Sequence, residues 1–345
     1  MTSTHDSPVA APREGVVAAH DPTTSILMWV WHLRYRSGAS TRALTVVSSM
    51  LLLFAIAMFF LAESTNTPLP IILLVNNALI LIGYWLPGSH YRWVRSTLQQ
   101  LTTHPWRAVS TRVLRAGRWS SVVEVVDDGA PVVFRVWIDP AHRAMITDTA
   151  YLIRERGKRA VLRVPGSREM FPARVREPIS PGEVPAVSVT ERWAGLARDR
   201  LLWMAAQLVL VFGVISLVSA LIWFSPYAIA LAAGVFVCVL AVAAFVMRQR
   251  LADFRLPALV ASGEWVRAAA ALGNWTARRD GTATAVATLR LDDGTVRVVT
   301  MPAASVDLLG AVVDSGSLWV TGTEGTVAVG FPGYPLLATG TIARP

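Results

Sequence analysis

The stretch at residues 201–247 constrains this chain most, because it contains 47 consecutive residues without a charged side chain. A charge at the centre of a bilayer costs about 2.5 to 3.5 kcal/mol, so membrane segments exclude charged residues. A second region, between Glu63 and Glu124, contains arginines but no acid. At 53% of 345 residues, the hydrophobic content exceeds that of ordinary water-soluble domains. These features predict a membrane protein.

Four apolar runs reach or approach the roughly 20 residues that a helix needs to cross hydrocarbon. Arginines flank these runs on one side only, and the positive-inside rule makes that side cytoplasmic. We therefore predict a multi-pass protein of a bacterial plasma membrane, with both termini cytoplasmic. Its four transmembrane helices are expected at residues 43–62, 69–86, 201–224 and 226–247.

The rest of the sequence repeats one pattern, a hydrophobic hairpin followed by a polar, β-rich module. Asp127-Asp128-Gly129 and Asp292-Asp293-Gly294 each separate two β-branched runs, which predicts β-hairpins because glycine tolerates the positive φ of a tight turn. The same order of elements follows both hairpins, which indicates internal duplication. The further elements expected are short helices at 141–156 and 303–313, and strands at 159–164, 170–175, 318–321 and 326–331.

The predicted fold class is accordingly an α+β membrane protein. It has two transmembrane hairpins, each followed by a small barrel-like or sandwich-like cytoplasmic module. The segments expected along the chain are a disordered tail (1–24), an interfacial segment (25–42), the first hairpin (43–86), a juxtamembrane stem with the first module (87–195), the second hairpin (196–247), and a second stem with its module (248–345).

The excess positive charge belongs to the first module and its stem. Residues 87–200 contain 19 basic and 11 acidic residues, a net charge of +8, whereas 248–345 contain 9 and 8, a net charge of +1. Attraction to anionic lipid, about 1 kcal/mol per basic residue at the surface, explains this excess without nucleic acid. The expected partners are the lipid bilayer, its anionic head groups, and a protein partner or a second copy of the chain. The residues expected to contact lipid are Arg92, Arg95, Arg107, Arg112, Arg115 and Arg118.

The sequence lacks the usual motifs of catalysis and metal binding. Its six histidines are scattered, and Cys238 is the only cysteine, so neither a metal-ligand spacing nor a thiolate cluster is present. We expect no enzyme activity, no cofactor and no metal. The polar residues Asn76, Asn77 and Gln207 lie within apolar runs, where hydrogen bonds between helices account for them.

The expected function is a non-enzymatic scaffold or accessory subunit that presents two cytoplasmic modules at the inner face of the membrane. The alternative is a component of a transporter or channel, in which the same three polar residues line a path. A membrane enzyme is the third possibility.

Overall fold

The computed structural model describes most of the chain outside the first apolar region. The described residues are 7–25, 27–28, 50, 97–117, 120–155, 157–223, 251–278 and 281–343, with scattered positions between 230 and 250. The chain divides into two compact units. One comprises Met1–His32, Val94–Arg198 and Ala252–Pro345, and the other comprises Leu33–Trp93 and Asp199–Leu251.

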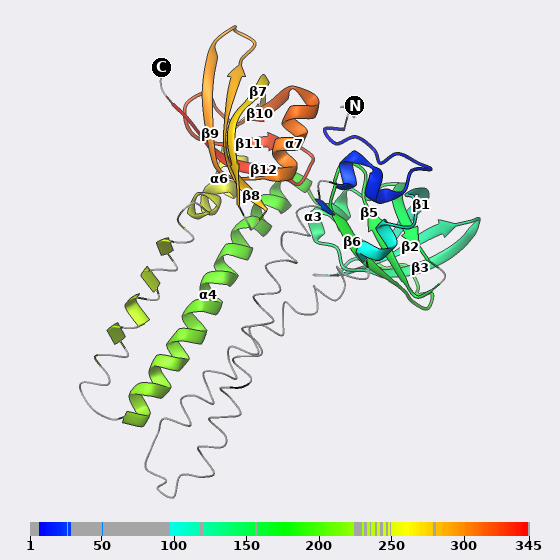
Figure 1. Ribbon diagram of the computed structural model, residues 1–345, viewed down its shortest axis with the longest axis horizontal. Helices are drawn as coiled ribbons and strands as arrows, with labels where there is room; N and C mark the ends of the chain where they lie inside the picture. The colour runs from blue at the N-terminus through cyan, green and yellow to red at the C-terminus, as the bar shows by residue number, and fades with distance from the viewer. Residues whose placement is uncertain are drawn as a thin grey trace, which may run out of the picture. The chain divides into compact units, whose positions relative to one another are not determined.

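Six antiparallel strands of the first unit close into the first barrel, in the order β1-β2-β3-β6-β5-β4 (Figure 1). Alternate residues, such as Val123, Phe134 and Leu162, face inward and fill the interior. Asp128 and Gly129 have φ values of 52° and 82° between β2 and β3, which confirms the predicted tight turn. The elements are β1 (Arg107–Arg115), β2 (Ser121–Asp127), β3 (Ala130–Val136), α3 (Pro140–Ala144), β4 (Thr149–Arg154), β5 (Arg159–Arg163) and β6 (Met170–Val175).

The second barrel has the same topology as the first. Its strand order is β7-β8-β9-β12-β11-β10, and α7 follows β9 as α3 follows β3. Helix α7 lies against this barrel (Figure 1). Such a match agrees with the predicted internal duplication. The elements are β7 (Val266–Ala277), β8 (Thr282–Arg290), β9 (Val296–Ser305), α7 (Val306–Ser315), β10 (Ser317–Val320), β11 (Gly325–Phe331) and β12 (Leu336–Ile342).

The helix predicted at 141–156 is wrong beyond Ala144, because Thr149–Arg154 of that segment forms strand β4. Ala150 and Leu152 alternate with more exposed residues and lie fully buried inside the first barrel. Strand β4 pairs with both β1 and β5, so it closes the barrel. Tertiary pairing here overrides a local pattern that is compatible with a helix.

Further helical segments include η1 (Ala18–His20), η2 (Leu251–Arg255) and α6 (Leu256–Ser262). The long helix α4 spans Val189–Trp223. Near its start, Ala194 packs with Leu256 and Val260 of α6 and with Leu337 of the second barrel. Its Thr190 hydroxyl accepts a hydrogen bond from the backbone N–H of Gly333 at 2.7 Å.

Among the described residues, no helix combines the length and the apolarity that crossing a bilayer requires. This finding overturns the predicted fold class of four transmembrane helices in two hairpins, and with it the expected multi-pass location in a plasma membrane. In the third apolar run, the helix begins well before the run, so the charged residues Glu191, Arg192 and Asp199 belong to the same helix, whose start docks on the second barrel. Apart from Met50, the predicted spans 43–62 and 69–86 lie outside the described residues, and 226–247 is described only at scattered positions.

Candidate functional site

Charged and polar side chains of the two barrels meet at the loop between β5 and β6, which contacts α7. We call this contact, formed by Arg168, Asp307, Gly310 and Asp314, the inter-barrel joint. Arg168 is 2% exposed, and its Nη2 donates to Oδ2 of Asp314 at 2.6 Å while its Nη1 donates to the backbone carbonyl of Asp307 at 3.1 Å. Such charge-assisted bonds are roughly twice as strong as neutral ones. The joint therefore ties the β5–β6 loop to one face of α7.

Glycine at position 310 makes this approach possible. A Cβ atom there would lie 2.7 Å from Nη1 of Arg168, well inside van der Waals contact. The equivalent loop of the second barrel, between β11 and β12, contributes to the same region, because the ring of Tyr334 lies against Gly166. The two barrels thus contact each other through corresponding loops. The β5–β6 loop contacts α7 through Arg168, and the β11–β12 loop contacts Gly166 through Tyr334.

Asp307 is the joint residue whose charge is most sensitive to its surroundings. Its side chain is 13% exposed, its carboxyl lies 3.7 Å from Nη1 of Arg168, and its Oδ1 accepts no hydrogen bond from the described residues. Burial raises the pKa of Asp307 from 3.8 to about 6; the guanidinium of Arg168 opposes this rise and Glu169 adds to it. This carboxyl can therefore change its charge near neutral pH.

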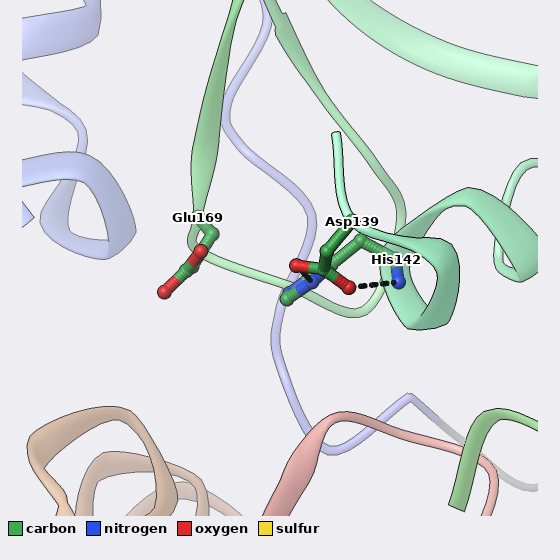
Figure 2. A group of neighbouring side chains, drawn as sticks. All are labelled: Asp139, His142 and Glu169. Atoms are coloured by element: carbon green, nitrogen blue, oxygen red, sulfur yellow. Dashed lines mark hydrogen bonds and ion pairs between the residues drawn. The ribbon is translucent and has the colours of Figure 1, made fainter. Parts of the chain in front are cut away.

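Three side chains beside the joint could in principle hold a divalent cation. Asp139, His142 and Glu169 each offer one ligand atom, and these atoms lie within 4.8 Å of one another (Figure 2). Both oxygens of Asp139 are already engaged, however. Oδ1 accepts from the backbone N–H groups of Ala141 and His142 as the N-cap of α3, and Oδ2 lies 2.8 Å from Nδ1 of His142.

The ring of His142 is also held by packing. It is 1% exposed, and its centroid lies 4.9 Å from the ring of Phe171 and 5.4 Å from that of Trp193. Figure 2 shows Asp139 and His142 joined by hydrogen bonds, with Glu169 to one side of the pair. The cluster is therefore built as a helix cap that supports the packing of α4, and not as a preformed cage for a cation.

Residues 7–25, which we call the N-terminal strap, pack on both barrels. Val9 is 1% exposed and belongs to the core of the second barrel. At the first barrel, the buried Arg163 donates through Nη1 to the hydroxyls of Thr23 at 2.8 Å and Thr24 at 3.2 Å, and the indole of Trp106 donates to Thr24 at 2.9 Å. Burial lowers the pKa of Arg163 to about 10, although Asp21 at 3.7 Å opposes this.

The predicted disordered tail therefore needs correction for residues 7–24. A polar segment of this composition favours disorder when it is taken alone. In the strap, however, the Thr24 hydroxyl accepts from buried donors of the first barrel, and Asp21 accepts from the backbone N–H of Thr24. Residues 1–6 lie outside the described part of the chain.

The residues predicted to contact lipid are only partly described. Arg107 is 38% exposed and pairs with Asp127 at 2.9 Å and Asp128 at 3.1 Å, acids that the β2–β3 turn brings to it. Arg112 and Arg115 are exposed on β1. Contact with lipid remains a prediction for these residues. The others, Arg92, Arg95 and Arg118, lie outside the described residues, as do Asn76 and Asn77, and Gln207 lies in α4 at a position whose side chain is not described.

No protein-family model matches this chain, and neither a curated protein nor a solved structure matches it. Fold and site alone thus define the class, a protein with two closed six-stranded barrels of one topology joined through a buried arginine.

Proposed function

We propose that this protein is a non-enzymatic scaffold that holds a protein partner against both β-barrels at once. The observation that carries the proposal is the inter-barrel joint, in which Arg168 fixes one barrel to a helix of the other. A partner that contacts both barrels loses less conformational freedom on binding when the two surfaces are already held together.

The chemistry of the described residues supports a binding role. Three of the buried titratable groups are engaged in structural contacts: Asp139 caps α3, Arg163 holds the strap, and Arg168 holds α7. The interiors of both barrels are filled with apolar side chains. These arrangements stabilise the fold, and they leave the outer faces of the strands as the surfaces for a partner.

The proposal is tested by recovering partners with the tagged full-length chain and measuring their affinity for purified variants. Arg168→Ala should weaken binding of a partner recovered in stoichiometric amount by about tenfold or more, because a loss of about 1.4 kcal/mol corresponds to tenfold. Arg255→Ala, at an exposed arginine of η2 that lies outside the strands of both barrels, is the matched control and should leave the affinity unchanged.

Arg168→Lys serves if the alanine variant does not fold, because lysine keeps the charge and loses the two-point contact. Circular dichroism melting establishes the folding of each variant. Absence of any stoichiometric partner, or equal affinity of the wild type and both Arg168 variants, would contradict the scaffold.

A further inference from the structure

Three arginines lie directly opposite one another across three neighbouring strands of the first barrel. Arg135 of β3 pairs with Arg174 of β6, and Arg174 pairs with Arg159 of β5. Paired residues of antiparallel strands point to the same side of the sheet, with Cβ atoms about 4.5 to 5.5 Å apart. All three side chains are exposed, so they form one outward-facing line, which we call the arginine row.

Like charges placed directly opposite each other destabilise a sheet. Arg135 donates through Nε to the neutral hydroxyl of Ser120 at 3.3 Å, and no carboxylate of the described residues pairs with its charge. The ion pairs found among the described residues involve other basic side chains, namely Arg107, His142, Arg154, Arg163 and Arg168. The row is therefore a concentrated positive charge that a bound anion would stabilise.

The second barrel supplies an internal comparison. At the same register of the corresponding strands, Thr300 of β9 pairs with Thr341 of β12, which pairs with Thr326 of β11. These threonines are exposed as well. The topology thus accepts a neutral row at this place, so the arginines of the first barrel are not required for folding the barrel.

An exposed aromatic ring adjoins the row. Trp137 follows Arg135 by two residues, is 42% exposed, and its ring centroid lies 5.3 Å from Cζ of Arg135. Its backbone N–H donates to the carbonyl of Pro172 at 3.0 Å, which holds it beside β6. Exposed aromatic rings next to arginines stack on the bases of single-stranded nucleic acids.

The curvature of the barrel determines whether a flat anionic membrane or a flexible chain of phosphates can contact all three arginines. Neighbouring strands of a closed six-stranded barrel turn by about 60° on average, so the row covers about 120° of the circumference. A flat bilayer that meets Arg174 leaves the two flanking arginines directed away from it. A flexible chain of phosphates can follow the curve and contact all three.

We infer that the arginine row and Trp137 form a binding surface for single-stranded nucleic acid, in which the guanidinium groups hold successive phosphates and the indole stacks on a base. This inference is independent of the scaffold proposed above, and it differs from the expectation drawn from the linear sequence, which included no nucleic acid. The guanidinium fork suits phosphate oxygens because it donates two parallel hydrogen bonds.

The test uses fluorescence anisotropy of a labelled oligothymidylate of about 12 nucleotides, within the usual site sizes of single-strand-binding barrels, with the full-length chain. Each phosphate contact contributes about −0.7 to the slope of the logarithm of the association constant against the logarithm of the salt concentration. Three contacts therefore predict a slope of about −2. The triple variant Arg135→Thr, Arg159→Thr, Arg174→Thr copies the side chains of the second barrel, and it should bind about tenfold more weakly and lose most of this slope. Trp137→Ala should weaken binding about fivefold or more.

A matched control changes the net charge by the same amount away from the row, through Arg267→Gln and Arg290→Gln on the second barrel and Arg255→Gln in η2. It should retain wild-type affinity. Equal loss in the control and the row variant would overturn the inference, since the binding would then reflect net charge alone. Absence of binding by the wild type would overturn it as well.

Two other polyanions complete the experiment. Polyphosphate should compete only weakly with the oligonucleotide. Its own binding should be the same in the wild type and in Trp137→Ala, because polyphosphate has no bases to stack. Vesicles of phosphatidylserine and phosphatidylcholine should not displace the oligonucleotide. If vesicles displace the oligonucleotide from the wild type and do not bind the row variant, the ligand of this surface is a lipid membrane and not nucleic acid. If Trp137→Ala binds the oligonucleotide as tightly as the wild type, the stacking site is refuted.

Discussion

Replacing Asp307 by Asn should remove a defined part of the pH dependence of folding. Burial raises the pKa of this carboxyl from 3.8 to about 6, so between these values the folded chain binds a proton that the unfolded chain releases. Asp307 therefore contributes stability that is fully present below about 3.8 and is lost as the pH rises through about 6. The pKa difference of about 2 corresponds to about 3 kcal/mol in total.

Urea denaturation at several pH values measures this contribution. From about pH 5 to about pH 7.5, the wild type should lose about 1.5 kcal/mol of unfolding free energy through Asp307, and Asp307→Asn should not show this loss. Asp314→Asn is the control, because it removes the charge that strengthens the bond to Arg168 at the same joint while leaving Asp307 in place. The reasoning is refuted if Asp307→Asn keeps the wild-type slope or if both variants flatten it equally.

Three substitutions test the packing of the joint, the strap and the helix cap. Gly310→Ala should lower the free energy of unfolding by about 1 to 3 kcal/mol, because the added methyl group overpacks the contact with Arg168. The loss should be smaller in an Arg168→Ala background. If urea denaturation shows that the two losses simply add, the contact is contradicted. Thr24→Val should lower the free energy of unfolding by about 1 to 3 kcal/mol, because Arg163 then lacks this acceptor. Limited proteolysis should cleave the strap of Thr24→Val sooner than that of Thr24→Ser. Asp139→Ala should lower the free energy of unfolding by about 1 kcal/mol because it removes the N-cap of α3, and Asp139→Asn should lower it by less. Equal melting temperatures of the two variants would argue against the cap.

The strands and turns of both barrels could be predicted to a large extent because their signals are local. Aspartate followed by glycine between β-branched runs predicted the β2–β3 and β8–β9 turns, and both strand pairs are present. The strand predicted at 170–175 coincides with β6. Strand β4 was missed, because a short segment read alone does not reveal that the barrel needs a partner for both β1 and β5.

The joint and the arginine row could not be predicted, because their members are distant in the sequence. Arg168 and the carbonyl of Asp307 are separated by 139 positions, and no periodicity links them. The row depends on strand register, which a sequence alone does not give, and a shift of one residue would point its arginines inward. The strap was misjudged because composition predicts disorder for an isolated segment and takes no account of buried donors that it can satisfy.

The common topology of the barrels gives this chain a property that a homodimer lacks. In a symmetric dimer, every substitution appears on both sides of the two-fold axis, so a contact surface must remain complementary to itself. Here the corresponding loops carry Arg168 in one half and Tyr334 in the other, and each has its own contact. Synthesis of one chain supplies both halves in a ratio of one to one, and either half is free to diverge without a matching change in its counterpart.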